Sequence, residues 1–168
     1  AVIVRILQLC HRGRLPPDVA SVGVFVDPAY EEVCEVAAHV GLAAVQLHGD
    51  ESFDFCRGLP YRVVKAVAVG EVTTPDEIRA IPDEITPLLD AHDPLGRGGT
   101  GRTIDWSVAS AVSRERRIFL SGGLAPNNVF RAIKTVQPYG VDVSSGVETA
   151  PGQKDAERLR LFFEQVTL

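Results

Sequence analysis

The sequence contains no methionine, only three cysteines and no long apolar run. Cys10, Cys34 and Cys56 are odd in number and far apart, so neither a disulfide framework nor a CxxC metal or redox site is expected. Because no run of about 18 apolar residues occurs, we expect no membrane span. The first residues carry no basic region and no clear cleavage site, which argues against a signal peptide. These absences predict a reduced, cytoplasmic protein.

Positive charge is also scarce. Lysine and arginine number 17 against 22 acidic residues, which gives a formal net charge of -5 and a pI near 5.4. Nucleic acid is therefore not expected as the main partner, because neutralising phosphates needs a basic surface. A small phosphorylated ligand needs only a few local N–H donors and one or two cations, so it remains compatible with the negative net charge. At 168 residues, with 45% hydrophobic and 23% charged residues, the chain has the composition of one globular domain with a sizeable core.

Six short apolar runs recur along the chain, with amphipathic stretches between them. They start roughly 20 to 30 residues apart, a spacing typical of βα units. Most are nearly continuous rather than alternating, which indicates strands covered on both faces, as in a parallel sheet. The expected strands are Ser21–Asp27, Ala43–Gly49, Arg62–Val69, Ile85–Asp90, Arg117–Ser121 and Gly140–Ser145.

The segments between these runs show helical spacing and helix-start signals. No linker or low-complexity tract interrupts them, so residues 1–168 are expected to form one domain. A repeated βα pattern fits either an open, doubly wound sheet or a closed (β/α)8 barrel, and six strands suit the open sheet by number. The expected helices are Val2–Cys10, Pro28–Val40, Ser52–Leu59, a helix starting at Thr74, Trp106–Val112, Pro126–Val136 and Asp155–Val166.

Ligands of parallel α/β folds bind at the carboxyl ends of the strands, so polar residues that end the apolar runs are the candidate site. Two glycine- and serine-rich corners follow the last two runs. Small residues let the backbone approach a ligand, and their N–H groups can hold an anion. Tight strand–helix turns would explain either corner alone, but the pair favours a phosphate site at Gly122, Gly123, Ser145 and Gly146.

Further polar residues lie at the other strand ends. Asp90 can act as a general acid if a partly apolar mouth favours its protonated form, although a capping or salt-bridged aspartate fits its position too. Gln46 and His48 alternate with apolar neighbours and should point to one side of their strand, either into the site or as structural polar groups. Lys65 and Asp142 complete the strand-end set.

Other motifs carry less weight. Residues 96–101 match GxGxxG, and residues 96–103 match a P-loop except for Arg102, but no strand leads directly into them. We interpret this segment as a mobile glycine-rich loop that can close over a substrate. The three cysteines lie on expected helices, and His39 and His92 have no partners at metal-ligand spacing. We therefore expect neither a metal nor a cofactor.

Seven strings in this order resemble the phosphoribosylanthranilate isomerases of tryptophan biosynthesis, from about residue 16 to the end. The most specific are QLHGDE, GGTGRTIDW and YGVDVSSGVE. The strings are Ser21–Asp27, Val45–Ser52 (VQLHGDES), Val64–Ala66, Leu88–Ala91, Gly98–Trp106 (GGTGRTIDW), Ser121–Val129 (SGGLAPNNV) and Tyr139–Asp155 (YGVDVSSGVETAPGQKD).

The resemblance implies a (β/α)8 barrel of which this chain holds strands three to eight and lacks the first two. The family's first strand carries a Lys-Ile-Cys-Gly motif with the general base, and its second leads to a Ser-x-Arg-Tyr loop. Neither motif is present, and Cys10 lacks the required setting. We therefore expect the 168-residue chain to bind the substrate's phosphate weakly, to expose unpaired apolar strand edges and not to catalyse the reaction by itself.

The reaction that the resemblance implies is an Amadori rearrangement, an aldose–ketose isomerisation. N-(5-phosphoribosyl)anthranilate opens its ribose ring and becomes 1-(2-carboxyphenylamino)-1-deoxyribulose 5-phosphate. Asp90 corresponds to the family's general acid, Gly123, Ser145 and Gly146 to its phosphate loops, and Gln46, His48 and Asp142 to polar residues at the mouth. The implied protein needs no cofactor and is a monomer or homodimer that binds a phosphosugar.

Two alternatives remain at this stage. The first is another phosphosugar barrel enzyme, such as indole-glycerol-phosphate synthase or a pentose-phosphate epimerase, which shares the phosphate corners but not QLHGDE or GGTGRTIDW. The second is a catalytically inert barrel fragment that retains only the phosphate site. Turnover of the anthranilate substrate distinguishes the isomerase from both.

Overall fold

The computed structural model describes residues 19–70, 72–91 and 104–168. The helix expected at Val2–Cys10 lies outside this part of the chain, as do Cys10, His92 and the glycine-rich loop at residues 96–101. All six expected strands and the other expected helices lie wholly or largely within the described residues.

Each of the six expected strands is present. β1 pairs with β2, β2 with β3, β4 with β5 and β5 with β6, in every case in parallel. The order in the sheet is β1-β2-β3-β4-β5-β6. A doubly wound sheet reverses its strand order part-way, whereas the wall of a barrel keeps the order of the chain. The strands are β1 (Val22–Phe25), β2 (Ala44–Leu47), β3 (Val63–Val69), β4 (Ile85–Ala91), β5 (Phe119–Leu120) and β6 (Gly140–Val141). The α/β class with parallel strands is thus confirmed.

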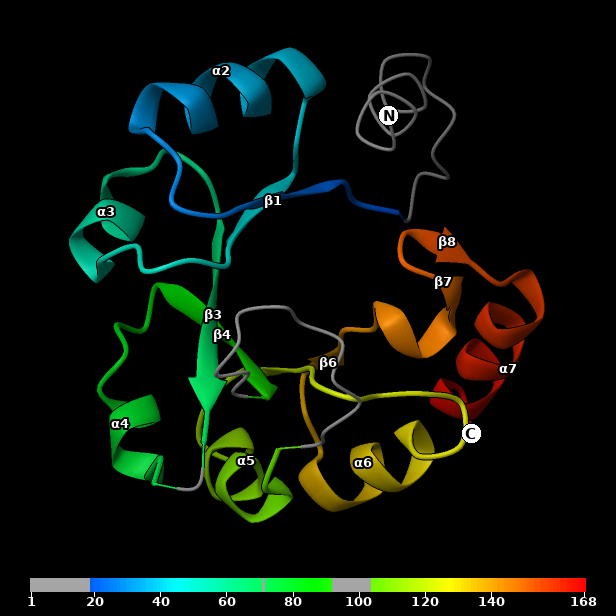
Figure 1. Cartoon of the computed structure of the whole chain (residues 1–168). Helices are drawn as coiled ribbons and strands as arrows, with labels where there is room; N and C mark the ends of the chain where they lie inside the picture. Colours follow the sequence, from blue (N-terminus) through cyan, green and yellow to red (C-terminus); the bar gives the residue numbers. More distant parts are fainter. Residues whose placement is uncertain (1–18, 71, 92–103) are drawn as a thin grey trace. The chain divides into compact units, whose positions relative to one another are not determined.

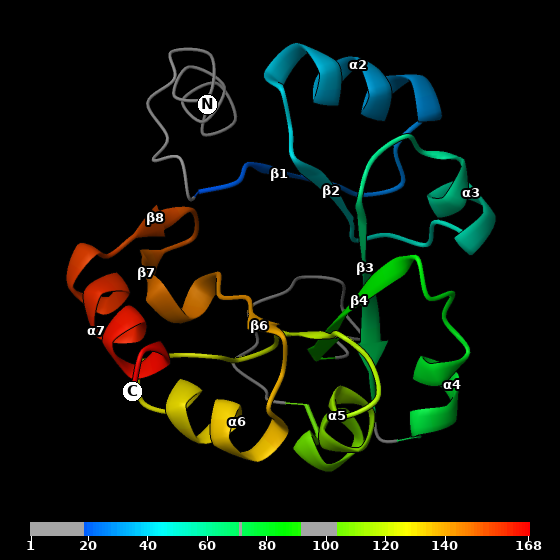
Figure 2. The ribbon, with the colours of Figure 1, turned by 180° about the vertical axis from the view of Figure 1, so that it is seen from behind.

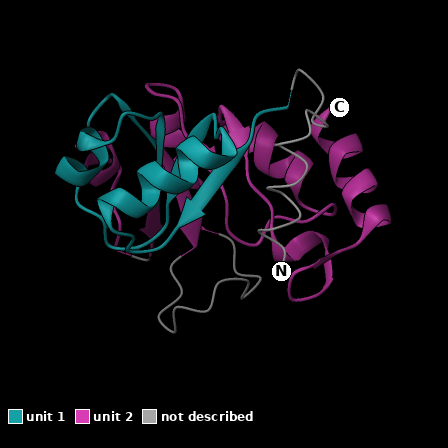
Figure 3. Ribbon diagram, turned by 90° about the horizontal axis from the view of Figure 1, so that it is seen from above, with its two compact units in different colours: residues 1–66, 82–86 teal, residues 67–81, 87–168 magenta. Residues whose placement is uncertain are grey.

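The chain divides into two compact units. The first comprises residues 1–66 and 82–86, and the second comprises residues 67–81 and 87–168 (Figure 3). The boundaries cut through β3 and β4, so the units do not follow a simple division of the sequence into two halves. That residues 1–168 form a single domain remains a prediction, and each unit is described by itself below.

In the first unit, α2 (Tyr30–Val40) follows β1 and α3 (Phe53–Gly58) follows β2. α2 buries Val33, Ala37 and Val40, which lie on one face at helical spacing. It ends at Gly41, whose φ of 70° is the left-handed conformation that glycine adopts without strain. Ser52 caps α3 by accepting a hydrogen bond from the backbone N–H of Phe55 at 3.1 Å.

In the second unit, four helices follow one another along the chain and pack in that order (Figures 1 and 2). They are α4 (Pro75–Arg79), α5 (Trp106–Ser113), α6 (Val129–Val136) and α7 (Ala156–Val166). Thr74 opens α4 with a capping box, in which Glu77 accepts the Thr74 N–H at 2.8 Å. The core of the unit includes Leu88, Leu89 and Leu120, each at most 1% exposed.

The last strand was expected to span Gly140–Ser145, but in the structure β6 ends at Val141. A single 3-10 turn, η1 (Ser145–Val147), follows it and leads into a hairpin that the sequence did not predict. The hairpin consists of β7 (Glu148–Ala150) and β8 (Gln153–Lys154), which pair antiparallel. Gly152, with a φ of 75°, lies in the turn between them.

Among the strands of the described residues, β1 lies at one end of the order and pairs only with β2. Val22 and Val24 in β1 are 45% and 61% exposed, and Val26, just after the strand, is 66% exposed. An edge strand with exposed valines is the kind of surface that pairs with a further strand or aggregates.

Candidate active site

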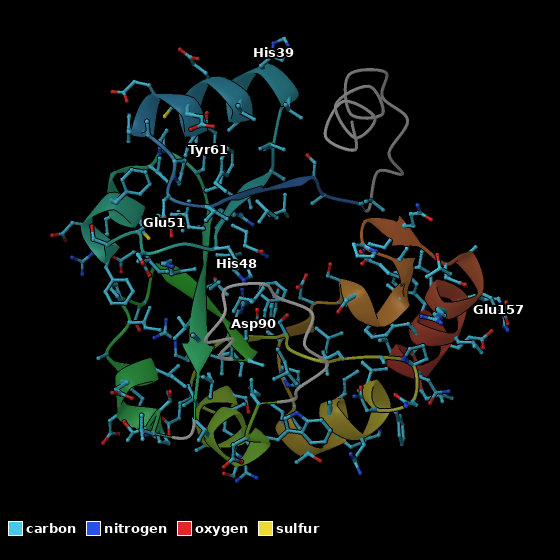
Figure 4. The ribbon with its side chains drawn as sticks, viewed as in Figure 1. His39, His48, Glu51, Tyr61, Asp90 and Glu157 are labelled. Atoms are coloured by element: carbon cyan, nitrogen blue, oxygen red, sulfur yellow. The ribbon has the colours of Figure 1, made fainter. Side chains whose placement is uncertain are left out.

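Gln46 and His48 belong to the end of β2 in the first unit. The Nδ1 atom of His48 lies 3.1 Å from Oε1 of Gln46, so the two side chains share one side of the strand, as their spacing predicted. The backbone N–H of His48 donates to the carbonyl of Phe25 at 2.8 Å and extends the pairing of β1 and β2 by one step. Figure 4 marks His48.

Lys65 does not join Gln46 and His48, although the sequence placed all three at strand ends. The register pairs Lys65 with Leu47 and Val64 with Gln46. Paired residues of parallel strands point to the same face, so Lys65 points to the face opposite that of Gln46. Its side chain is 7% exposed and sits among buried groups. Successive side chains of a strand point to opposite faces, and this alternation separates Lys65 from Gln46 and His48. Position at a strand end alone does not take the alternation into account.

Glu51, the last residue of the QLHGDE string, is the partner of Lys65. Nζ of Lys65 lies 3.1 Å from Oε2 of Glu51 and also donates to the carbonyls of Gly49 at 2.6 Å and Ala66 at 3.0 Å. Oε1 of Glu51 accepts the backbone N–H of Asp27 at 2.9 Å. The carboxylate therefore joins the end of β1, the loop after β2 and the side chain from β3.

The ionisation of Glu51 follows from these contacts. Burial alone would raise the pKa of the Glu51 carboxyl, but backbone N–H groups and the Lys65 ammonium together hold the pKa below its ordinary value. The side chain is 3% exposed, so the pair is a buried ion pair. Asp27 adds a bond of its own, because its Oδ1 accepts the N–H of Asp50 at 2.7 Å.

Asp90 is the second-to-last residue of β4, in the second unit, and is half-buried (Figure 4). Its Oδ1 accepts the N–H of Ala91 at 2.9 Å. Gly122, which follows β5, packs against this segment. A Cβ on Gly122 would lie 2.7 Å from the nitrogen of Ala91 and 3.2 Å from Oδ1 of Asp90. Only glycine permits this approach, and the φ of 81° at Gly122 requires glycine as well.

The two glycine- and serine-rich corners lie against each other. A Cβ on Gly146 would lie 1.8 Å from the carbonyl oxygen of Leu124 and 3.2 Å from Cα of Ala125. The η1 turn after β6 is therefore packed directly onto the loop after Gly123. The second unit thus brings together Asp90 and the four glycine and serine residues that the sequence assigned to phosphate.

Backbone donors are available at both corners. Ser145 and Gly146 begin η1, and the first N–H groups of a helical turn have no acceptor within it. Within the described residues, no hydrogen bond takes the N–H of Gly122 or Gly123. Gly123 also has positive φ, at 62°. Successive N–H groups in such turns form a concave anion site.

Asp142 follows β6 and is joined to the end of β5. Its Oδ2 accepts the hydroxyl of Ser121 at 3.2 Å, and its N–H donates to the carbonyl of Leu120 at 2.8 Å. Ser121 is 7% exposed, so this hydrogen bond is largely shielded from water. It links the residue that begins the loop after β5 to the residue that follows β6.

The described residues contain no group of three or more histidine, cysteine, aspartate or glutamate side chains arranged to hold a metal ion. None of their helices is long and apolar enough to span a bilayer.

Comparison with known proteins addresses the identity of the chain. The family model described as N-(5'-phosphoribosyl)anthranilate (PRA) isomerase matches residues 5–165. The chain belongs to the phosphoribosylanthranilate isomerase family. Isomerisation of N-(5'-phosphoribosyl)anthranilate, a step of tryptophan biosynthesis, is the function that this membership assigns.

Relatives and solved structures agree with the family model. The N-(5'-phosphoribosyl)anthranilate isomerase of Trichlorobacter lovleyi is 50% identical over 149 residues, which are 88% of this chain and 72% of the relative. The crystal structure of the phosphoribosylanthranilate isomerase of Thermotoga maritima aligns with a TM-score of 0.84 and 38% identity, over 98% of this chain and 80% of that one. A structure of the isomerase in complex with reduced 1-(o-carboxyphenylamino)-1-deoxyribulose 5-phosphate aligns with a TM-score of 0.80, 36% identity and coverage of 98% and 79%.

Proposed function

We propose that this phosphoribosylanthranilate isomerase carries out its Amadori rearrangement by general acid–base catalysis, with Asp90 as the general acid. The reaction needs a proton delivered to the ribose ring oxygen, so that the ring opens, and a proton removed from C2 of the sugar. The observation that carries the proposal is the packing of Asp90 against Gly122, which sets a carboxyl group beside a backbone suited to holding phosphate.

The phosphate is proposed to bind at the N–H groups of Gly122, Gly123, Ser145 and Gly146. The contact between Gly146 and the Leu124 carbonyl supports one shared anion site rather than two separate turns. Gln46, His48 and Asp142 are proposed to contact the rest of the substrate. The related structure that holds a reduced 5-phosphate product supports a phosphosugar as the ligand class.

The base that takes the C2 proton is not proposed among the described cysteines. Cys34 lies in α2 and Cys56 in α3, so both are on helices rather than at strand ends. Burial raises the pKa of the Cys56 thiol, which keeps it protonated and unreactive at neutral pH. The family resemblance instead implies a base in a Lys-Ile-Cys-Gly motif, which does not occur in residues 1–168.

The finer architecture is also a proposal. We infer that β1 to β6 correspond to strands three to eight of a (β/α)8 barrel, which the sequential strand order supports. The enzyme is proposed to be an aldose–ketose isomerase. It is also proposed to be a monomer or homodimer; the Thermotoga maritima isomerase is described as dimeric, and a structure of monomers generated from it is known.

The proposed role of Asp90 is tested with Asp90→Asn in the full-length protein. The amide keeps the shape of the side chain but supplies no acidic proton, so kcat should fall about 10²- to 10⁴-fold while affinity for the reduced product analogue stays within a few-fold. Asp83→Asn is a matched control, because Asp83 is exposed and lies just before the same strand. A near-normal kcat in Asp90→Asn would remove Asp90 as the acid.

The same assay separates the isomerase from an inert phosphate-binding barrel. Loss of the fluorescent anthranilate substrate is followed with the 168-residue chain and with the full-length protein. We expect turnover only with the full-length protein. Full turnover by the 168-residue chain would contradict the assignment of the base to a strand outside it.

A further inference from the structure

Lys154, in the unpredicted hairpin, contacts the turn proposed to hold phosphate. Its Nζ donates to the carbonyl of Ser144 at 3.0 Å and to the Ser144 hydroxyl at 3.3 Å. The same ammonium pairs with Oε1 of Glu148 at 2.6 Å. The Glu148 side chain is 12% exposed and that of Lys154 is 43% exposed, so the pair is partly shielded from water.

The contact of Lys154 with the Ser144 carbonyl affects one proposed phosphate donor, the N–H of Ser145, through a single peptide group. The carbonyl of Ser144 and the N–H of Ser145 belong to the same planar peptide unit. A cation on the carbonyl oxygen polarises that unit and makes its N–H a stronger donor. The carbonyl also accepts the N–H of Val147 at 3.4 Å. The orientation of the peptide plane, and therefore of the Ser145 N–H, is fixed by these two bonds.

The hairpin and the start of α7 hold Lys154 in place. Glu148 in β7 is paired in register with Lys154 in β8. The N–H of Asp155 donates to the carbonyl of Val147 at 2.8 Å, and the guanidinium of Arg158 donates to the carbonyl of Glu148. The residues after the hairpin are thus bonded back to Val147 of η1 and to Glu148 of β7.

We propose that Lys154 is a positioning residue for phosphate binding, acting through the Ser144–Ser145 peptide and itself placed by Glu148. The inference rests on the proposed phosphate site at Ser145 and Gly146. It assigns a role to the end of the YGVDVSSGVETAPGQKD string that the acid–base mechanism does not use. The ligand class is a phosphate monoester, with inorganic phosphate as the probe.

Substitution of Glu148 distinguishes a positioning role of Lys154 from simple attraction between its charge and phosphate. If Lys154 acted only as a local positive charge, removing its counter-charge with Glu148→Gln would strengthen phosphate binding. If Lys154 must be held against Ser144, Glu148→Gln loosens the ammonium and weakens binding. The positioning role therefore predicts a loss from a substitution that makes the site more positive.

The test is a titration of the isotope-labelled full-length protein with inorganic phosphate, followed at the backbone N–H signals of Ser145 and Gly146. Lys154→Met should weaken binding about three- to tenfold, and Glu148→Gln should weaken it in the same direction. Lys154→Arg, which keeps a charged donor, should stay within about twofold of the wild type. Lys134→Met is the control, because Lys134 lies on α6 over the ring of Phe130.

Kinetics provides a second readout that a purely structural role would not give. Phosphate contributes equally to binding of the substrate and of the transition state, so Lys154→Met should raise KM by a similar factor and leave kcat nearly unchanged. A variant that merely lost folded protein would lower kcat and keep KM.

The outcomes separate this inference from the proposed function. If phosphate leaves the Ser145 and Gly146 signals of the wild type unshifted, the phosphate site itself is wrong and this inference fails with it. If the wild type responds but Lys154→Met binds equally well, only the positioning role is wrong. Tighter binding by Glu148→Gln would likewise overturn positioning, and weaker binding by both variants with unchanged kcat supports it.

Discussion

Removing one member of the buried Glu51–Lys65 pair should destabilise the protein far more than breaking an exposed pair. The two side chains are 3% and 7% exposed, and Lys65 points to the face opposite that of Gln46. Substituting Glu51→Gln leaves an ammonium that is still bonded to the carbonyls of Gly49 and Ala66 but has lost its counter-charge. Loss of one partner of a buried pair costs about 3–5 kcal/mol, and the remaining carbonyl bonds place Glu51→Gln near the lower end, at about 3 kcal/mol.

The control for this prediction is the exposed pair on α7. Arg160 lies 2.5 Å from Glu157, with side chains 53% and 65% exposed, so water screens the pair and Glu157→Gln should cost far less stability than Glu51→Gln. Both variants are compared with the wild type by denaturant unfolding. Lys65→Met and the double variant complete a mutant cycle, in which the double variant should cost at least about 1 kcal/mol less than the sum of the single ones.

Two results would refute the reasoning. If Glu51→Gln costs no more than Glu157→Gln, the ion pair contributes nothing beyond an exposed one. If the costs of Glu51→Gln and Lys65→Met simply add, the two groups do not interact in the folded protein.

Two further predictions concern pH and the packing of the corners. Because the pKa of Glu51 is lowered on folding, its contribution to stability is complete above the unfolded pKa and is lost as pH falls through the folded pKa; below about pH 5, unfolding free energy should fall more steeply in the wild type than in Glu51→Gln. Gly146→Ala should raise KM for the substrate about tenfold or more, because the added Cβ would meet the Leu124 carbonyl, whereas Gly58→Ala, with open space around it, should leave KM unchanged. Equal KM values for the two alanine variants, or parallel pH curves, would contradict these arguments.

The strand positions could be predicted because the apolar runs are short, nearly continuous and evenly spaced. Helix starts were equally visible, as at Ser52 and at Thr74 with Pro75. The choice between an open sheet and a barrel could not be made from the runs, since both contain the same βα units. Strand order decides between them, and strand order is a long-range property that periodicity does not encode.

The candidate site was predicted only in part. The shared face of Gln46 and His48 follows from period-two alternation, which acts within one strand. The ion pair of Glu51 and Lys65 was missed because its partners are 14 positions apart and meet only when β2 and β3 pair in register. The hairpin carrying Lys154 was missed because its strands are too short to show periodicity, although the Pro151–Gly152 pair is a turn signal that could have located it.

A structure of the full-length protein with reduced 1-(o-carboxyphenylamino)-1-deoxyribulose 5-phosphate tests the central claim most directly. Our account predicts the phosphate within hydrogen-bond distance of the N–H groups of Gly122 or Gly123 and of Ser145 or Gly146. It also predicts the Asp90 carboxyl within hydrogen-bond distance of an oxygen of the sugar chain. A phosphate bound away from these corners, or an Asp90 carboxyl turned away from the sugar, would contradict it.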